Sequence, residues 1–95
     1  MEDKAYRMLG LARRAGKLIC GEEMVLDSIR SRKAGIVIVA TDASDNTKKM
    51  FRDKCSYYHI PIYEYALKAD FGHASMAISD KNFAESIKTD LEGKS

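Results

Sequence analysis

The sequence predicts an α/β protein, a three-layer α/β/α sandwich with a mixed sheet of roughly four strands. Segments with the apolar spacing of a helix alternate with short apolar runs, one run is continuous and β-branched, and no linker or repeat interrupts them. Strands that are separated by helices form a sheet with helices on both faces. The 95 residues suffice for one modest core, so residues 1–95 are expected to form a single domain, with 92–95 disordered.

The first half of the chain carries the clearest periodicity. Residues 3–15 are predicted to form an amphipathic helix that Gly16 ends in a left-handed conformation. KLIC (17–20) is a short predicted strand, and a second helix is predicted over 21–34. The β-branched run GIVIVA (35–40) predicts a strand that is covered on both faces. The apolar positions of the first helix are Ala5, Met8, Leu9 and Ala12.

A third helix is predicted over residues 41–59, with Asp42 or Ser44 as its cap. IPIYEY (60–65) predicts a third strand, and Pro61 fits the start or the edge of that strand better than its centre. The third predicted helix, over 41–59, has an apolar side and a basic side. The basic side carries Lys48, Lys49 and Arg52 and is predicted to face solvent.

The last third of the chain is expected to contain three short elements. Residues 66–74 predict a brief helix, and SMAIS (75–79) predicts a brief strand. Residues 80–93 predict a final helix with Asp80 as its cap. Its inward positions are Phe83, Ile87 and Leu91.

Composition argues against several classes of protein. The chain is 45% apolar and 32% charged, as is usual for a soluble globular domain. No apolar run approaches the roughly 18 residues of a membrane span, and the N-terminus lacks the pattern of a signal peptide, so a cytoplasmic protein with no membrane partner is expected. Cys20 and Cys55 are too few for a zinc site and are predicted to be small buried residues.

No constellation in the sequence indicates catalysis. His59 and His73 have no Cys, Asp or Ser companion at a suggestive spacing. The two glycines of LGLARRAG do not have the spacing of a phosphate-binding loop. The sequence therefore predicts a protein that is not an enzyme and that has no metal and no cofactor.

The charge distribution is more informative than the net charge of +2. The first 33 residues carry eight Lys or Arg and five Asp or Glu, whereas the remaining residues carry eight and nine. Positive charge is concentrated in RRAGK (13–17) and RSRK (30–33), a pattern that fits either a solvated helix face or a phosphate-binding surface. Tyr57 and Tyr58 could stack on bases, although tandem aromatic residues at a helix end usually pack.

Two glutamates follow a glycine where the first strand is predicted to lead into the second helix. Glu22 and Glu23 in a first helical turn are each expected to stabilise the protein by about 0.3–1 kcal/mol through the helix dipole. This structural role explains the acidic pair without any ligand. A ligand with hydrogen-bond donors is the alternative explanation.

Several phrases together resemble a known family. The order and spacing of four segments resemble those of the kink-turn RNA-binding ribosomal protein family. The segments are RAGKLICGEE, IVIVATDAS followed by NTKK, KCSYYHIPI, and DKNFA. The family includes the archaeal large-subunit protein seven-A-e and the eukaryotic thirty-e protein. The similarity is greatest to a small bacterial branch of this family. It covers residues 9–65 and 80–91. The resemblance implies an α/β/α sandwich that binds kinked, internally looped RNA.

The family grips RNA at the corner between its first strand and second helix, with the motif Gly-x-Asn-Glu and a basic residue three positions on. Gly21 matches this motif. Glu23, Met24 and Asp27 replace the Asn, the Glu and the basic residue. An ionised Glu only accepts hydrogen bonds, so Glu23 would pair with a guanine N–H edge. The loop before Met76 is also shorter than in the family.

The resemblance implies an RNA-binding protein of translation or of the ribosome. Its partners would be structured RNA, either ribosomal or another kink-turn RNA, together with ribosomal proteins, and the protein is expected to be a monomer. The alternative is a protein-interaction module that has lost kink-turn binding. The predicted RNA-binding residues are Arg14, Lys17, Gly21, Glu22, Glu23 and Lys33, and Arg13 and Arg32 would add positive charge at the flanks.

Overall fold

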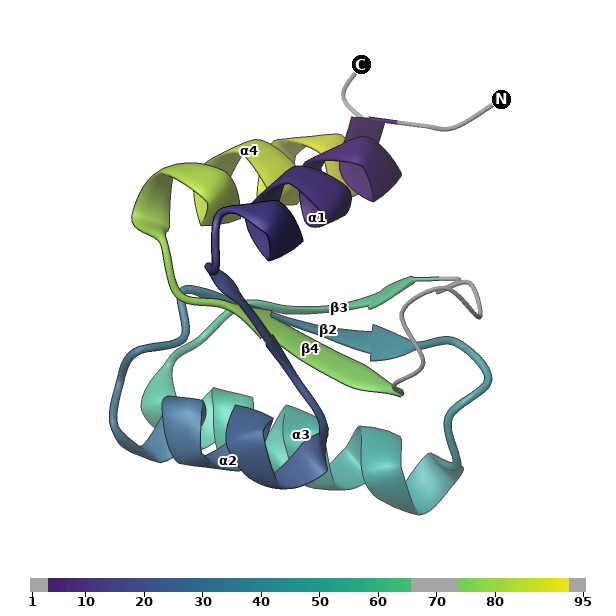
Figure 1. Ribbon diagram of the computed structural model, residues 1–95. Helices are drawn as coiled ribbons and strands as arrows, with labels where there is room; N and C mark the ends of the chain where they lie inside the picture. Colours follow the sequence, from purple (N-terminus) through teal and green to yellow (C-terminus); the bar gives the residue numbers. More distant parts are fainter. Residues whose placement is uncertain (1–3, 66–73, 93–95) are drawn as a thin grey trace.

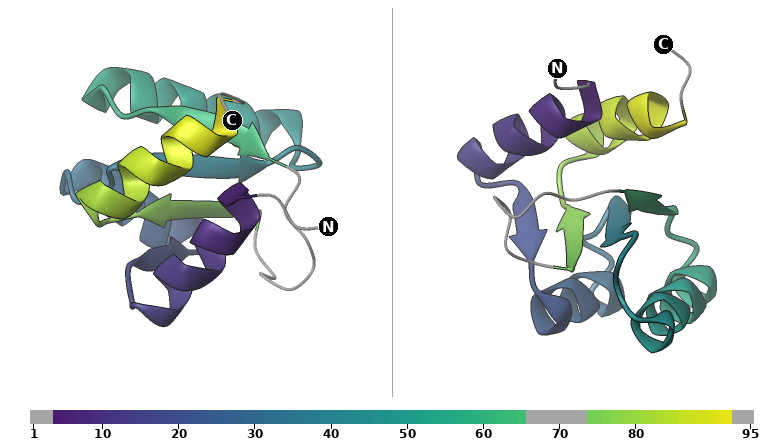
Figure 2. Two further views of the ribbon diagram at one scale, coloured as in Figure 1. Left: turned by 90° about the horizontal axis from the view of Figure 1, so that it is seen from above. Right: turned by 90° about the vertical axis from the view of Figure 1, so that its right-hand side faces the viewer.

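The computed structural model describes residues 4–65 and 74–92, which form a sheet between two pairs of helices (Figure 1). Helices α1 and α4 cover one face of the sheet, and α2 and α3 cover the other (Figure 2). This arrangement confirms the predicted three-layer sandwich. The elements in chain order are α1 (Lys4–Arg14), β1 (Leu18–Cys20), α2 (Glu22–Arg30), β2 (Ile36–Ala40), α3 (Asp45–Tyr58), β3 (Ile62–Tyr65), β4 (Ser75–Ile78) and α4 (Lys81–Leu91).

The sheet is mixed, as predicted, and has the strand order β1-β4-β2-β3. Strand β4 runs antiparallel to both of its neighbours, whereas β2 and β3 are parallel. Strand β3 is an edge strand, and Pro61 immediately precedes it and accepts a hydrogen bond from the Val37 backbone N–H at 2.9 Å. Pro61 therefore lies where its missing N–H disrupts no strand pairing.

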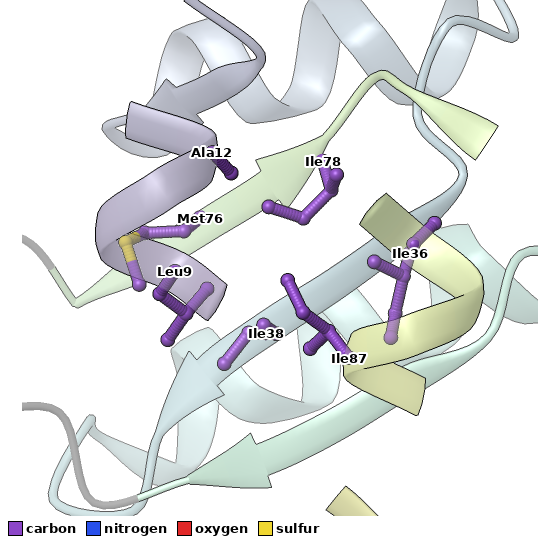
Figure 3. Packing of buried hydrophobic residues seen from close by; sticks show 8 residues of the cluster. Leu9, Ala12, Ile36, Ile38, Met76, Ile78 and Ile87 are labelled. Carbon is purple, nitrogen blue, oxygen red and sulfur yellow. The ribbon is translucent and has the colours of Figure 1, made fainter. Parts of the chain in front are cut away.

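The central strands divide the core into two layers because successive side chains point to opposite faces. Ile36 and Ile38 pack toward α1 and α4, and Val37 and Val39 pack toward α2 and α3. Figure 3 shows the first layer, in which Leu9 and Ile87 from the two helices lie over the strands. Burial of each such side chain stabilises the fold by about 1.5–3 kcal/mol. The prediction that this strand is covered on both faces is confirmed.

Several predicted boundaries are wrong. Helix α2 ends at Arg30 rather than at residue 34, because Arg32 turns into the left-handed region with φ 63°. Helix α3 begins at Asp45, where the Ser44 hydroxyl accepts a hydrogen bond from the Thr47 backbone N–H at 3.2 Å. Ser44 rather than Asp42 is therefore the cap.

The two cysteines differ in burial. Cys55, on the inner side of α3, is fully buried, as predicted, whereas Cys20 is only half-buried, which corrects the prediction for that residue. Asp80 caps α4, with its carboxylate accepting from the Asn82 backbone N–H at 2.7 Å. The brief helix predicted at 66–74 and the shortened loop before Met76 fall, apart from the last residues of each, outside the described part of the chain.

Three helices end at the same edge of the sheet, and each ends in a Schellman motif. In each motif one residue lies in the left-handed region, with φ 74° at Gly16, 63° at Arg32 and 60° at His59. The backbone N–H groups of that residue and of the next residue donate hydrogen bonds to carbonyls of the last helical turns, with N···O distances of 2.9–3.3 Å. Glycine is the usual residue at this position because it has no Cβ. In this protein only Gly16 is a glycine, and Arg32 and His59 occupy the other two positions.

Candidate nucleic-acid interface

The corner between β1 and α2 depends on the backbone of Gly21. This residue has φ 96° and ψ 146°, a conformation that side-chain-bearing residues rarely adopt. Its N–H donates to the Ser75 carbonyl of β4 at 3.2 Å, and its carbonyl accepts the first helical hydrogen bond from Val25 at 2.9 Å. A glycine is therefore needed to hold the sheet and the start of α2 together at this point.

The side chains of the three residues after Gly21 are exposed to solvent. Glu22, Glu23 and Met24 are exposed, Met24 by 61%. The backbone N–H groups of these three residues precede the first hydrogen bond of α2, so they have no acceptor within the helix. The corner thus offers backbone donors, two carboxylate acceptors and an apolar side chain to a ligand. The structure brings the predicted residues Gly21, Glu22 and Glu23 together here.

Further carboxylates lie at the same edge. Strands β2 and β3 end here, where Thr41 donates to the Tyr65 carbonyl at 3.1 Å, and α3 begins here (Figure 1). We call this side the acidic edge. Its exposed carboxylates belong to Glu22, Glu23, Asp42 and Asp45. Among its described residues, 21–23, 41–45 and 74–75, there is no Lys or Arg.

The other three predicted residues lie at the opposite edge. The carbonyl of Lys17 accepts from Ser79, which follows β4, whereas Gly21 is bonded to Ser75 at the start of β4. Four residue steps along β1 separate Lys17 from Gly21 by about 13 Å. Arg14 at the end of α1 and Lys33 after α2 lie on the Lys17 side (Figure 1). The structure therefore divides the predicted site between two edges.

Positive charge is concentrated where the three helices end. We call this side the basic edge, and define it by Arg14, Lys17, Arg32, Lys33 and Lys81. None of these five side chains forms an ion pair within residues 4–65 and 74–92. Lys81 was not among the predicted residues, because its position beside the basic runs depends on the pairing of β4 between β1 and β2.

The basic side of α3 is mostly neutralised by neighbouring carboxylates. Lys48 and Arg52 both pair with Glu64 of β3, at 3.4 and 3.0 Å, and Lys49 pairs with Asp53 at 3.2 Å. Exposed pairs of this kind stabilise a protein by less than about 1 kcal/mol. They do, however, place a carboxylate beside each of these cations, so this face is less suited to phosphate than the basic edge.

The perturbed titratable groups lie in the core or beside the last helix. Burial raises the pKa of the Cys55 thiol to about 11. Burial also raises the pKa of the Cys20 thiol, although the positive charge of Arg13 lowers it in part. Burial also raises the pKa of Tyr63 to about 12, helped by the hydrogen bond from its hydroxyl to Glu92 at 2.6 Å. The net effect raises the pKa of all three groups, which disfavours the ionised forms that would act as nucleophiles or bases.

Two further chemistries find no support in the residues that the structure describes. No group of three His, Cys, Asp or Glu side chains in this part of the chain could hold a metal ion. No helix within it has the length and apolar character needed to cross a bilayer. What the described surface offers is an acidic corner with exposed backbone donors at one edge and a cluster of cations at the other.

The fold and the glycine corner define a class of protein that the comparisons name. The ribosomal protein L7Ae/L30e/S12e/Gadd45 family matches residues 3–89, and the chain belongs to this family. The resemblance to the kink-turn ribosomal proteins is thereby confirmed at the level of the family.

Relatives of similar length make the membership more specific. The chain is 46% identical to the RNA-binding protein YlxQ of Enterococcus faecium, over 95% of this chain and 93% of that protein. It is 36% identical to the protein of the same name from Bacillus subtilis (strain 168), over 86% and 89%. A solved structure of a protein with unknown function from Bacillus halodurans C superposes with a TM-score of 0.91 at 30% identity, covering 96% of this chain and 99% of that one.

Proposed function

We propose that this protein binds RNA and is not an enzyme. The observation that carries the proposal is the 46% identity to a relative that is named an RNA-binding protein, over almost the whole length of both chains. The cluster of unpaired cations at the basic edge supports it, because phosphate contacts from Lys and Arg supply most of the affinity of nucleic-acid binding.

We further propose that the acidic edge reads bases in kinked RNA. Gly21 would let the RNA approach the backbone closely, and the N–H groups that begin α2 would donate to base or phosphate acceptors. The carboxylates of Glu22 and Glu23 would accept from guanine N–H groups that a non-Watson–Crick pair leaves exposed. Recognition of this kind relies on hydrogen bonds to base edges, so it requires a groove that the kink has widened.

The family resemblance also favours a role in translation, with ribosomal or other kink-turn RNA as the ligand and ribosomal proteins as neighbours. The division of the predicted residues between two edges changes how such a complex would be built. Lys17 lies about 13 Å along β1 from Gly21, so Arg14, Lys17 and Lys33 would contact the RNA at the other end of the strands from the bases that Glu23 would contact. In the proposed complex they would hold a more distant stretch of the RNA backbone.

A binding titration tests both levels of the proposal. The purified protein is titrated against a labelled kink-turn RNA and a straight duplex of equal length, at about 50 and 200 mM salt. A preference for the kinked RNA, weakening with salt, is the expected result. Substitution Glu23→Ala should reduce that preference about tenfold, because it removes a charged acceptor from a base contact.

The matched control is Glu85→Ala, which removes an exposed carboxylate from α4, on the other face of the sheet. This variant should bind both RNAs like the unmodified protein. Equal affinity of the Glu23→Ala variant and the unmodified protein for the kinked RNA would refute base reading by Glu23. Failure of the unmodified protein to bind either RNA would refute the binding of both kink-turn RNA and duplex RNA.

One observation favours a second candidate, a protein-interaction module. The acidic edge carries four exposed carboxylates and, in its described residues, no Lys or Arg, which opposes the approach of a phosphate backbone. A basic segment of a protein partner would suit this edge better. Equal and weak binding of kinked and straight RNA in the titration above would favour this candidate over base reading.

A further inference from the structure

The outer face of α3 forms a hollow that ends beside the basic edge. The hollow is open to solvent and has a volume of about 600 Å³. Its lining residues recur at helical spacing, so one face of α3 provides the whole surface. They are Asn46, Lys49, Met50, Asp53, Lys54, Tyr57 and Tyr58.

Tyr57 stands out at the end of this hollow. Its side chain is 76% exposed, the largest exposure among the large hydrophobic residues that the structure describes as exposed. Its ring meets that of Tyr58 edge to face, with the centroids 4.9 Å apart and the planes at 78°. This contact leaves Tyr57 largely exposed, so most of its surface is accessible to solvent.

Tyr58 connects this aromatic pair to the basic edge. The guanidinium carbon of Arg32 lies 5.3 Å from the centroid of the Tyr58 ring, within the range of a cation–π interaction. The Tyr57 side chain, the Tyr58 ring and the guanidinium of Arg32 therefore lie in sequence across the ends of α3 and α2. Lys33 follows Arg32 directly, and Lys54 lies one turn before Tyr58.

The charge of the surface favours an anion. Arg32, Lys33 and Lys54 form no ion pair in the described chain, whereas Asp53 is already paired with Lys49 at 3.2 Å. The hollow and its rim thus have an excess of positive charge. An exposed aromatic ring beside unpaired cations is the combination that binds unpaired nucleotides, because bases stack on the ring while phosphates contact the cations.

The backbone of Arg32 adds an independent observation. Arg32 occupies the left-handed position of a Schellman motif, where a glycine would avoid a cost of about 1 kcal/mol. Side-chain stacking on Tyr58 offsets part of this cost but does not require an arginine at this position. Backbone strain of this kind is often found at functional sites, where the side chain serves a ligand.

We propose that Tyr57, Tyr58, Arg32 and Lys33 form a second RNA-contact surface, which binds a single-stranded segment. A base stacks on Tyr57, and the adjoining phosphates contact Arg32 and Lys33. Single strands fit this surface better than a duplex, since the bases of a duplex are stacked on one another and present no face to Tyr57. The surface lies at the other edge of the sheet from Gly21, and the inference rests on the proposed RNA binding.

The test uses a labelled oligouridine of about twelve nucleotides, which forms no kink and no duplex. Fluorescence anisotropy at about 50 and 200 mM salt gives the affinity and its salt dependence. Substitution Tyr57→Ala should weaken binding about tenfold, and Tyr57→Phe should restore it to within about twofold, because Phe keeps the aromatic face. The pair Arg32→Ala and Lys33→Ala should lower the salt slope by about 0.7 for each phosphate contact that is lost.

Matched controls come from α1. Leu11→Ala removes an exposed apolar side chain, and Arg7→Ala with Lys4→Ala removes two exposed cations away from the basic edge. These variants should bind oligouridine like the unmodified protein. Melting temperatures of all variants show that each one folds.

Other results would overturn the inference. Undiminished binding by Tyr57→Ala refutes stacking, and binding of an oligoglutamate peptide as tightly as oligouridine shows that the surface responds to negative charge alone. The outcome is also distinct from that of the kink-turn titration. A protein that prefers kinked RNA but ignores oligouridine retains the proposed function and loses this surface, and the reverse pattern retains only this surface.

Discussion

At the edge where β1 leads into α2, the exposed charged side chains of the described residues are carboxylates, whereas the basic edge, where α1, α2 and α3 end, carries ammonium and guanidinium groups. Helix dipoles explain part of this difference. Acidic groups near a helix start and basic groups near a helix end each contribute about 0.3–1 kcal/mol. Charge at either edge is therefore weak support for a ligand when taken alone.

Features that the dipole does not explain separate the two edges. The acidic edge has Gly21 at φ 96° and exposed backbone donors at the position of the family's RNA motif. The basic edge has Arg32 at a position that suits glycine and an exposed Tyr57 beside it. Backbone geometry and side-chain exposure, more than the sign of the charge, therefore indicate where a ligand is expected.

Reversing the charge of either edge should change RNA binding more than any other substitution. Arg32→Glu with Lys33→Glu is expected to weaken oligouridine binding about 100-fold, because phosphate contacts become repulsive. Glu22→Lys with Glu23→Lys should instead strengthen binding to the straight duplex and steepen its salt dependence, because it adds cations, and should remove the preference for kinked RNA, because it removes the proposed acceptors. Anisotropy titrations measure both. If Lys4→Glu with Arg7→Glu on α1 reproduced the first effect, net charge rather than the basic edge would control binding.

The reactivity of the Cys20 thiol should report which of the two edges an RNA occupies. Cys20 directly precedes Gly21 and is half-buried, whereas Cys55 is fully buried with its pKa raised to about 11. Iodoacetamide at about pH 8 should therefore modify Cys20 first. Kinked RNA should slow this modification about fivefold, and oligouridine should leave it unchanged. Mass spectrometry follows each cysteine, and equal protection by both RNAs would mean that they share one edge.

Helix-end substitutions should separate stability from binding. Arg32→Gly is expected to raise the free energy of unfolding by about 0.5–1 kcal/mol, because glycine adopts the left-handed conformation without strain, and to weaken oligouridine binding at the same time. Gly16→Ala is the opposite control. Its Cβ would meet no atom within 4 Å, so the expected loss of about 1 kcal/mol would come from the backbone alone. Urea unfolding measures both, and a less stable Arg32→Gly variant would contradict the strain argument.

The smallest expected effect is a change in protein stability at alkaline pH, which comes from Tyr63 and does not involve either edge. The pKa of Tyr63 is raised from 10.0 to about 12, so the folded protein holds this proton more tightly than the unfolded chain. Its contribution to stability is complete below pH 10 and is lost as the pH rises toward 12. Unfolding curves of Tyr63→Phe should show a shallower decline in this range. The same decline in both proteins would assign the loss to other groups.

The sequence predicted the layers well because their signal is local. The run of β-branched residues at 35–40 and the spacing of Leu9 and Ala12 each follow from periodicity, and the structure confirms their burial on both faces of the sheet. Helix ends were harder. The early end of α2 depends on Arg32 adopting a conformation that sequence patterns assign to glycine.

The candidate site was predicted only in part, because its division depends on strand order. Lys17 and Gly21 are close in sequence, yet they lie at opposite ends of β1. Lys33 and Lys81 become neighbours of Lys17 only through the insertion of β4 between β1 and β2, a pairing that no local pattern encodes. Whether Gly21, Glu22 and Glu23 contact RNA is still a prediction, which the Glu23→Ala titration addresses.

The described residues of the two edges place opposite charges at the two ends of the strands, and these charges form an electric dipole along the strand direction. In the field of a polyanion such a dipole experiences a torque, which turns its positive end forward during diffusion. The first encounter with RNA would thus be oriented before any specific contact forms. RNA bound at the basic edge, as proposed, would leave Gly21 and its neighbouring carboxylates accessible to a second segment of RNA.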